Sequence, residues 1–258
     1  MVNGQSVSGD WVRRFHAAPD AAVRLICFPH AGGSAASFFS LSGAVSPAAD
    51  VLAIQYPGRQ DRRHEPCIED LRKLADAVAT QLRPWLDRPV ALFGHSMGAT
   101  LAFEVATTLE RDGIVPLSLF ASGCRAPSRH RDRRFDTRVD LVEDDTLVAE
   151  LKRLSGTDQL LLADDQVLRL ILPALRADYK AVQTYRYRPG PRLACPIQAL
   201  VGNEDPQVTI DEARSWAEHT TGAFGLLVFP GGHFYLSSHT TAVTTAISEQ
   251  ITARSKSA

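Results

Sequence analysis

The chain has 258 residues, of which 45% are hydrophobic and 22% are charged, a composition typical of a globular protein with a sizeable core. Its formal net charge of −1 gives no electrostatic reason to expect a nucleic acid or an anionic membrane as partner. No apolar run approaches the length of a membrane span, and residues 1–14 lack the apolar core of a signal peptide, so we expect a cytoplasmic protein.

Four cysteines are spread along the chain with no C-x-x-C pair and no zinc-ligand spacing. Cys27, Cys124 and Cys195 lie in or beside apolar segments, where a buried free thiol is expected in preference to a disulfide. The cysteines therefore predict neither a disulfide framework nor a metal site.

The first part of the chain alternates short apolar runs with turns. Residues 1–22 are polar and rich in alanine and glycine, and we expect them to run loosely up to a first strand at 23–28, with Trp11 and Phe15 as the side chains that could attach this arm to the body. A second short strand is predicted at 51–55, followed by Tyr-Pro-Gly-Arg. Apolar residues then recur at helical spacing from 68 to 85, which predicts an amphipathic helix covering one face of a sheet.

The stretch Gly-His-Ser-Met-Gly at 94–98 matches the G-x-S-x-G pattern and lies between an apolar run at 89–93 and a helical pattern at 97–110. Strand, sharp turn and helix in this order are what a nucleophile elbow requires. Ser96 would stand at the start of the helix, where unpaired amides favour developing negative charge. A Gly/Ser turn that fits the pattern by chance is the alternative, but the surrounding elements favour Ser96 as nucleophile.

The turn Pro-His-Ala-Gly-Gly-Ser at 29–34 follows the first strand at once and is too rich in glycine to continue it. It resembles the His-Gly-Gly loop that supplies one oxyanion-hole amide in α/β-hydrolases. We therefore expect the amides of Ala31 and Met97 to form an oxyanion hole, because two fixed N–H donors stabilise the tetrahedral intermediate of acyl transfer. A plain β-turn is the simpler interpretation of 29–34 taken alone.

The alternation of strand and helix breaks after a strand predicted at 117–121. Residues 125–191 contain only helical patterns, one at 147–154 and another at 168–182 that Pro173 should kink or divide. A helical insertion at this place is typical of a lid that excludes water and shapes an acyl pocket. An independent helical subdomain is the alternative, although its apolar stripes need the main body to bury them.

Strand and helix alternate again after the insertion, with a strand at 196–201, a helix at 210–219, a strand at 225–229 and a final helix at 240–252. This alternation predicts an α/β protein with a mostly parallel central sheet flanked by helices. Together with the elbow, it favours a single domain of the α/β-hydrolase fold over residues 1–258, with 125–191 as a helical lid insertion.

A serine nucleophile needs a base to remove its proton. In α/β-hydrolases the serine, the acid and the histidine follow one another in this order, each after a strand. Among eight histidines, His233 directly follows a late strand and has glycines at 231 and 232, so we expect it to be the base. His239 is the second choice, and His30 and His95 are expected to shape the loops around the oxyanion donor and the nucleophile.

The base in turn needs a carboxylate that fixes its tautomer. Asp205 lies four residues past the end of the strand at 196–201, where its loop should reach His233. Glu204 is the competitor, and loop position and acid type favour Asp205. Asp211 is expected instead to cap or charge the first turn of its helix.

Six motifs in order, spread over roughly residues 11–250, resemble the type II thioesterases of polyketide and nonribosomal peptide synthesis. One departure is Cys124, where relatives are expected to carry a basic residue, and it affects nothing catalytic. The motifs are Phe-Pro-His-Ala-Gly-Gly at 28–33, Gln-Tyr-Pro-Gly-Arg at 55–59, Gly-His-Ser-Met-Gly at 94–98, Ser-Gly-Cys-Arg-Ala-Pro at 122–127, Gly-Asn-Glu-Asp-Pro at 202–206 and Pro-Gly-Gly-His-Phe at 230–234.

This resemblance implies hydrolysis of acyl groups from the phosphopantetheine arm of acyl or peptidyl carrier proteins, which clears stalled or mis-primed chains from a synthase. It implies that His233 deprotonates Ser96, that the pantetheine thiol leaves, and that water releases the acid. No metal and no tightly held cofactor is expected, because the substrate carries its own phosphopantetheine. The implied partners are the carrier domain and its acyl thioester, with no nucleic acid and no membrane.

Residues 125–138 carry six arginines against two aspartates. Because carrier proteins are typically acidic, we hypothesise that these arginines, together with Arg59, Arg62 and Arg63, border the entrance and steer a carrier toward the site. A solvated arginine-rich loop at the start of the lid is an equally good interpretation.

Two other functions fit the same residues. A carboxylester hydrolase or lipase would use the same triad, and a comparison of matched thioesters and oxoesters would separate it from a thioesterase. A non-catalytic hydrolase-fold module that only binds a carrier or an acyl ligand is the other alternative. The intact set of Ser96, Asp205 and His233 argues against such a module.

Overall fold

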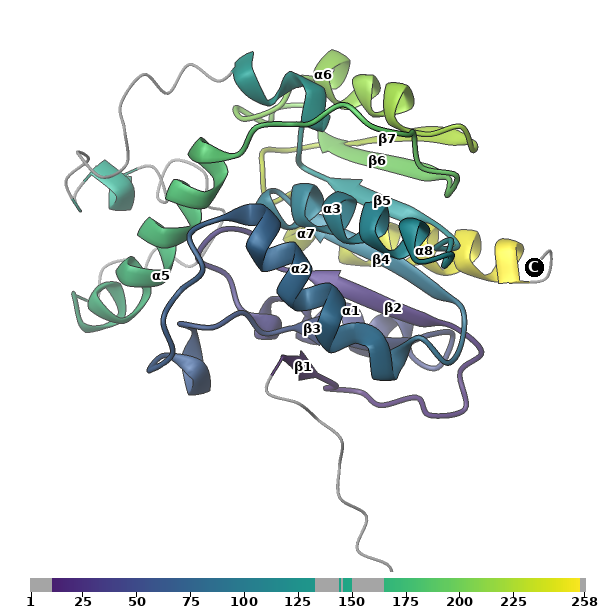
Figure 1. Cartoon of the computed structure of the whole chain (residues 1–258), viewed down its shortest axis with the longest axis horizontal. Helices are drawn as coiled ribbons and strands as arrows, with labels where there is room; N and C mark the ends of the chain where they lie inside the picture. Colours follow the sequence, from purple (N-terminus) through teal and green to yellow (C-terminus); the bar gives the residue numbers. More distant parts are fainter. Residues whose placement is uncertain (1–10, 133–143, 145, 150–164, 256–258) are drawn as a thin grey trace, which may run out of the picture.

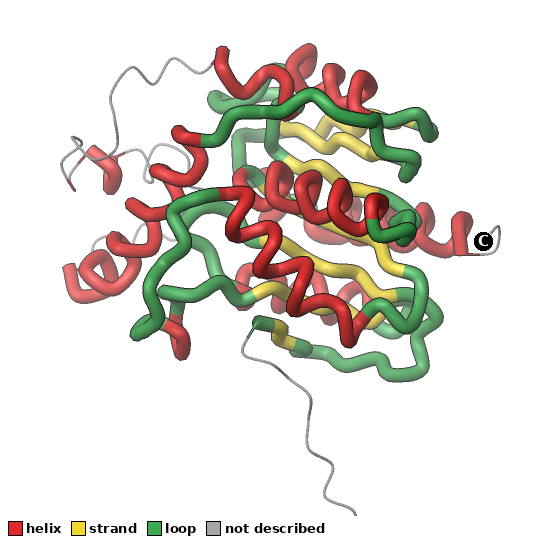
Figure 2. Tube along the Cα trace, viewed as in Figure 1, coloured by secondary structure: helices red, strands yellow, loops and turns green. Residues whose placement is uncertain are grey.

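The computed structural model describes residues 11–132, 144, 146–149 and 165–255. Its strands are β1 Val12–Arg13, β2 Arg24–Phe28, β3 Asp50–Ile54, β4 Val90–His95, β5 Leu119–Ser122, β6 Ile197–Gly202 and β7 Phe224–Phe229. They form one seven-stranded sheet in the order β1-β3-β2-β4-β5-β6-β7 (Figure 1, Figure 2). All neighbours are parallel except β1, which pairs antiparallel with β3. The predicted mostly parallel α/β sheet is confirmed, and its architecture is that of the α/β-hydrolases.

The α-helices of the described residues cover both faces of this sheet. They are α1 Phe39–Val45, α2 Leu71–Leu82, α3 Met97–Arg111, α5 Asp165–Thr184, α6 Ile210–Arg214, α7 Tyr235–Ser238 and α8 Thr240–Ser255. Helices α2 and α3 pack together on one face, and α1 and α8 pack together on the other (Figure 1). Helix α5 lies apart from both pairs, at the left of the view (Figure 1).

Strand β2 shows why both faces of the sheet need a cover. All five of its residues are buried. Ile26 and Phe28 belong to the core on the side of α2 and α3, whereas Leu25 and Cys27 belong to the core on the side of α1 and α8. A strand buried on both faces is a nearly continuous apolar run, which is the pattern that predicted it.

The carboxyl ends of the central strands meet at one edge of the sheet. Phe28 pairs with Gly94 at the ends of β2 and β4, and His95 pairs with Ser122 at the ends of β4 and β5. Strands β6 and β7 are likewise paired to their last residues. The loops that follow these strands therefore start side by side, at the edge where open α/β sheets bind ligands.

The N-terminal arm differs from the loose run predicted for residues 1–22. Residues 12 and 13 pair with β3, and the carbonyl of Trp11 accepts a hydrogen bond of 2.8 Å from the amide of Gln55. The guanidinium of Arg62 lies 4.3 Å from the centroid of the Trp11 ring. Trp11 and Phe15 pack against the core, as expected of an attached arm. The pairing of this arm with β3 joins residues far apart in sequence, which a local pattern does not predict.

Three helical features also differ from the sequence predictions. Helix α1 was not predicted, and the helix expected at 210–219 is the short α6 followed by a 3-10 helix, Ser215–His219. Helix α5 runs unbroken through Pro173, so the predicted division of this helix is wrong. The turn after the proline carries the buried Leu175 and Asp178, and their contacts with the body of the protein hold it helical despite the lost backbone hydrogen bond.

The predicted lid at 125–191 is described in part. Its described residues contain a 3-10 helix, Pro127–Asp132, and α5, and no strand. Leu147 and Val148 are helical and buried, and the rest of the helical pattern at 147–154 lies outside the described residues. That these residues act as a lid stays a prediction. No helix in the described part of the chain is long and apolar enough to cross a membrane.

Candidate active site

Ser96 lies on a sharp turn between β4 and α3, with φ 55° and ψ −120°. Such a backbone conformation costs a non-glycine residue about 1–3 kcal/mol and is characteristic of nucleophile elbows. Gly94 and Gly98 make the turn sterically possible. A Cβ at Gly94 would lie 2.1 Å from the carbonyl oxygen of Gly98, and a Cβ at Gly98 would lie 2.0 Å from that of Phe28.

His233 and Asp205 form a buried pair on the loops after β7 and β6. The Nδ1 atom of His233 lies 2.8 Å from Oδ2 of Asp205, and their side chains are 2% and 0% exposed. The other oxygen of Asp205 accepts a hydrogen bond of 2.8 Å from the amide of Gln207. Because an ionised carboxylate only accepts, Nδ1 carries the proton and Nε2 is left as a base. Glu204, the competing acid, is exposed.

The groups predicted to act together line one small cavity. Ser96, Met97, Ala31 and His233 surround about 30 Å³ of space, together with Tyr179, Val182 and Gln207. The structure therefore brings together the expected nucleophile, base and both expected oxyanion donors.

A second cavity of about 20 Å³ lies on another side of Ser96 and Met97, and Thr100, Gly123, Cys124 and Arg125 belong to its lining. Val182 and Gln207 line both cavities.

Two further histidines lie near His233. The ring centroid of His95 is 5.0 Å from that of His233, and the ring centroid of His30 is 6.0 Å from that of His95. The Nδ1 atom of His95 lies 2.9 Å from Oγ of Ser122, and that oxygen lies 2.6 Å from the hydroxyl of Tyr235. Burial, and then the positive charge of a protonated His233, lower the pKa of His95 well below its usual value. The same two causes lower the pKa of His30 to about 4. Both rings are therefore neutral near pH 7 and add no charge beside His233.

His239, the second choice for the base, lies elsewhere. Its Nε2 atom is 2.9 Å from the carbonyl oxygen of Pro230, so it contacts the backbone of the loop that carries His233. Asp211 pairs with Arg214 on the exposed side of α6, while Thr209 caps that helix. Asp211 was expected to cap this helix or to place its charge in the first turn, and the second of these is what the structure shows.

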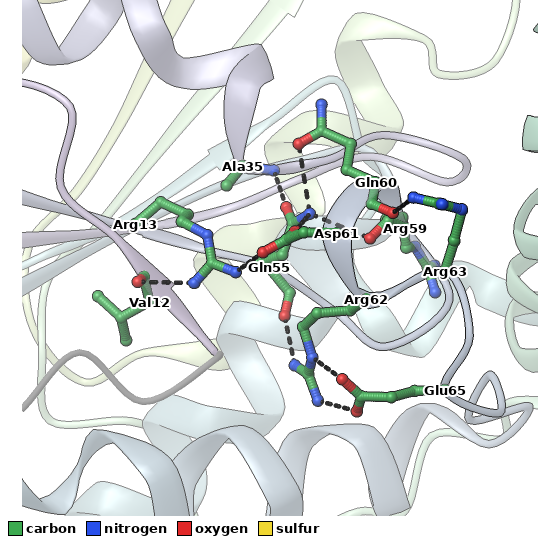
Figure 3. Close-up of polar contacts among 10 residues, drawn as sticks. All are labelled: Val12, Arg13, Ala35, Gln55, Arg59, Gln60, Asp61, Arg62, Arg63 and Glu65. Atoms are coloured by element: carbon green, nitrogen blue, oxygen red, sulfur yellow. Dashed lines mark hydrogen bonds and ion pairs between the residues drawn. The ribbon is translucent and has the colours of Figure 1, made fainter.

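Sequence reasoning missed the polar contacts that hold the turn at 29–34. The segment after β3, which carries the Gln-Tyr-Pro-Gly-Arg motif, supplies two of them. The side-chain oxygen of Gln55 accepts a hydrogen bond of 2.8 Å from the amide of Ala35 (Figure 3). The hydroxyl of Tyr56 donates to the carbonyl of Pro29. A buried acid on α5, Asp178, accepts from the amide of Gly32. The motif was the available signal, whereas nothing in the sequence paired it with Asp178.

The hypothesis that Arg59 and Arg62 steer a carrier is wrong, because both are buried, at 4% and 5% exposed. Arg62 pairs with Glu65 and donates to the carbonyl of Gln55 (Figure 3), and Arg59 pairs with Asp178. Arg63 is exposed. The residues from 133 to 138 of the arginine-rich stretch lie outside the described residues.

For the cysteines and the other possible metal ligands, the sequence predicts neither a disulfide framework nor a metal site. The four cysteines form no disulfide with one another. Cys27 and Cys195 are buried, and burial raises the pKa of both thiols. Among the residues that the structure describes, no cluster of three or more histidine, cysteine or acidic side chains could hold a metal.

Comparison with known proteins identifies one family over nearly the whole chain. The family model for the thioesterase domain matches residues 23–251. A probable cadicidin biosynthesis thioesterase from Streptomyces griseus is 52% identical over 97% of this chain and 68% of its own length. The thioesterase PikA5 from Streptomyces venezuelae is 49% identical over 95% of this chain and 86% of its own length.

A solved structure gives the same result. BorB, the type II thioesterase of the borrelidin biosynthetic cluster, superposes with a TM-score of 0.87 at 51% identity, covering 93% of this chain and 97% of its own. The resemblance drawn from the six motifs is confirmed.

Proposed function

The chain belongs to the thioesterase family and is a thioester hydrolase, and from this premise we propose that it acts on acyl groups bound to carrier proteins. It removes stalled or mis-primed chains from the phosphopantetheine arm of an acyl or peptidyl carrier in polyketide or nonribosomal peptide synthesis. The relatives support this assignment, because BorB is a type II thioesterase from a biosynthetic cluster and the cadicidin protein is a biosynthesis thioesterase.

The proposed reaction passes through an acyl-enzyme. Nε2 of His233 takes the proton of Ser96 Oγ, which attacks the thioester carbonyl, and the amides of Ala31 and Met97 hold the oxyanion. The carbon–sulfur bond breaks, and the thiolate receives the proton from His233. A water deprotonated by the same imidazole then attacks the acyl ester, releasing the acid and restoring Ser96. Asp205 stabilises the imidazolium throughout, and no step uses a metal or a cofactor.

The single observation that best supports this mechanism is the shared cavity of Ser96, His233, Ala31 and Met97. These residues come from three loops at the carboxyl edge of the sheet, and Asp205 orients the imidazole from a fourth. A chance cluster of polar residues would not place a nucleophile, a carboxylate-paired base and two backbone donors around one space.

Hydrolysis of acyl-carrier substrates tests the proposal. We expect an acyl group on a phosphopantetheinylated carrier to be released faster than the same group on a small thiol, and a thioester faster than the matched oxoester. The Ser96→Ala variant should be inactive on all of them. Preference for the oxoester would indicate a carboxylester hydrolase. Absence of turnover, with no reaction between Ser96 and a serine-directed phosphonate, would indicate a binding module.

Carrier recognition is the finer part of the proposal. Arg63 and Arg129 are exposed. Arg129 forms an ion pair with Glu218, in which the guanidinium nitrogen lies 3.3 Å from the carboxylate oxygen. Arg125 forms an ion pair with Glu212, and its side chain is 13% exposed. If exposed arginines steer an acidic carrier, Arg63→Gln with Arg129→Gln should lower kcat/KM for the carrier substrate and flatten its salt dependence. Turnover of a small, neutral acyl thioester by the same variant is the control and should not change.

A further inference from the structure

A buried ion pair lies beside the turn that carries Ala31. Arg59, in the loop after β3, pairs with Asp178 in the middle of α5, and their side chains are 4% and 1% exposed. Burial raises the pKa of Asp178, and the guanidinium of Arg59 opposes that rise. Because desolvation offsets much of the attraction in a buried pair, such a pair is weak evidence for a role in stability. The contacts that the pair makes with the neighbouring turn are a better guide to its role.

The second oxygen of Asp178 contacts the turn itself. Oδ2 accepts a hydrogen bond of 2.8 Å from the amide of Gly32, which has φ +74°. Leu175, one turn earlier on α5, packs so closely that a Cβ at Gly32 would lie 2.8 Å from its Cδ1 atom. The amide of Gly32 is thus occupied by Asp178, while Ala31, one residue earlier, lines the cavity beside Ser96.

The residues at the two ends of the same turn are held by hydrogen bonds from the loop after β3. The carbonyl of Pro29 accepts from Tyr56, and the amide of Ala35 donates to Gln55. The Nε2 atom of Gln55 donates in turn to the carbonyl of Arg59 at 3.3 Å (Figure 3). The loop after β3 therefore fixes both ends of the turn, and Asp178 fixes its middle from α5.

We propose that Asp178, held in place by Arg59, is a positioning residue for thioester hydrolysis that orients the oxyanion turn through the amide of Gly32. It keeps the peptide between His30 and Ala31 at the angle from which the Ala31 amide meets the oxyanion. Because Asp178 belongs to α5, the same contact makes the oxyanion hole complete only while α5 lies in place. The inference rests on the proposed function, since it assumes that the Ala31 amide is an oxyanion donor.

The expected effect falls on kcat. An oxyanion exists in the tetrahedral transition state and not in the bound thioester, so a displaced donor lowers kcat with little change in KM. Loss of one oxyanion donor costs about 10²–10³-fold in kcat. A donor that is displaced rather than removed should cost somewhat less, about 10–10²-fold.

Two double variants separate positioning from folding. Arg59→Met with Asp178→Asn removes both charges and keeps an oxygen that can accept from Gly32. Arg59→Met with Asp178→Leu has a side chain of similar size and no acceptor. Neither variant buries an unpaired charge. The leucine variant leaves the amide of Gly32 without its acceptor, so we expect it to unfold at a somewhat lower denaturant concentration than the asparagine variant and to be folded under the assay conditions. We expect kcat on a small acyl thioester to be about 10–10²-fold lower for the leucine variant than for the asparagine variant.

A transition-state analogue gives the second readout. A trifluoromethyl ketone analogue of the acyl thioester forms a tetrahedral adduct on Ser96, and its affinity should fall in parallel with kcat. Equal kcat in the two variants, or a difference confined to KM, would overturn the inference. If the leucine variant does not fold, Arg59→Met with Asp178→Ala replaces it, with the same expected loss and the same overturning result. Failure of the proposed function would appear separately, as a wild type without thioesterase activity or an active Ser96→Ala variant.

Discussion

Oδ2 of Asp205 lies 2.8 Å from Nδ1 of His233, although 28 residues separate them in the chain. A carboxylate that accepts from Nδ1 keeps the proton on that atom and leaves Nε2 as the base that the proposed reaction uses. The pair is almost fully shielded from water, so its electrostatic effect on the imidazolium is large.

Substitutions in this relay should abolish turnover without unfolding the protein. We expect Ser96→Ala and His233→Ala to lower kcat by about 10⁴-fold or more, and Asp205→Asn by about 10³–10⁴-fold, because the asparagine favours the wrong tautomer. The measurement is steady-state hydrolysis of an acyl thioester, with circular dichroism as the check on folding. Glu204→Gln, next to Asp205 but exposed, is the control and should stay active. A fully active Asp205→Asn would refute the assignment of the acid.

The sequence predicted those parts of the fold that depend on local pattern. Strands β2 and β4 are continuous apolar runs, and α2 and α3 carry apolar residues at helical spacing, so each was located within a few residues. Strand β1 has two residues and exists because it pairs with β3, and a pairing of this kind leaves no local pattern. Helix α1, Phe-Ser-Leu-Ser-Gly-Ala-Val, contains a glycine and two serines, all of low helix propensity, and packing against α8 holds it.

The residues around the candidate site also fall into those that the sequence predicted and those that it did not. Ser96, Asp205 and His233 were predicted to act together because each follows a strand and has glycine or proline nearby. The structure brings the three to one edge of the sheet, and their catalytic roles stay a prediction. Asp178 was not located, because a single acid within an amphipathic helix usually faces water. Only the folded chain brings it to Arg59 and Gly32, 119 and 146 residues away.

The glycines of the elbow should tolerate no side chain. Gly98→Ala places a Cβ 2.0 Å from the backbone oxygen of Phe28, and backbone cannot move aside without separating β2 from α3. We expect this variant to lose several kcal/mol of unfolding free energy or to be recovered as insoluble protein. Gly190→Ala is the matched control, because a Cβ there has no neighbour within 4 Å. Urea denaturation should place it within about 0.5 kcal/mol of wild type, and a similar result for Gly98→Ala would contradict the proposed close approach.

The C-terminal end of α5 should depend on one buried acid. Oε1 of Glu104 on α3 accepts from the hydroxyl of Tyr185, and Oε2 pairs with Arg72 at 2.7 Å. Tyr185→Phe removes one of these contacts and should cost about 1–2 kcal/mol in unfolding free energy. The exposed pair of Lys180 and Glu69 joins the same helix to the loop before α2. Glu69→Gln should therefore cost less than about 0.5 kcal/mol, and equal losses in the two variants would show that burial does not set the difference.

Acid should destabilise the protein through its neutral histidines. The pKa of His30 is lowered to about 4, mainly by burial, whereas in the unfolded chain an ordinary histidine titrates near 6.5. Between these values the unfolded state binds the proton and the native state does not, so unfolding free energy falls as pH falls. His95, whose pKa is lowered by burial and by His233, acts in the same direction.

The loss of unfolding free energy and the pH range over which it occurs can be measured. Each such histidine should contribute a loss of about 1 kcal/mol per pH unit as the pH falls below 6.5. Acids held by arginine contribute at lower pH, since the hydrogen bond from Arg62 holds the pKa of Glu65 below its usual 4.5. Urea unfolding of His30→Gln between pH 6.5 and 4.5 should therefore show a shallower slope than wild type. His64→Gln, at an exposed position, should follow the wild-type slope. Parallel slopes for wild type and His30→Gln would show that His30 is already protonated in the native state.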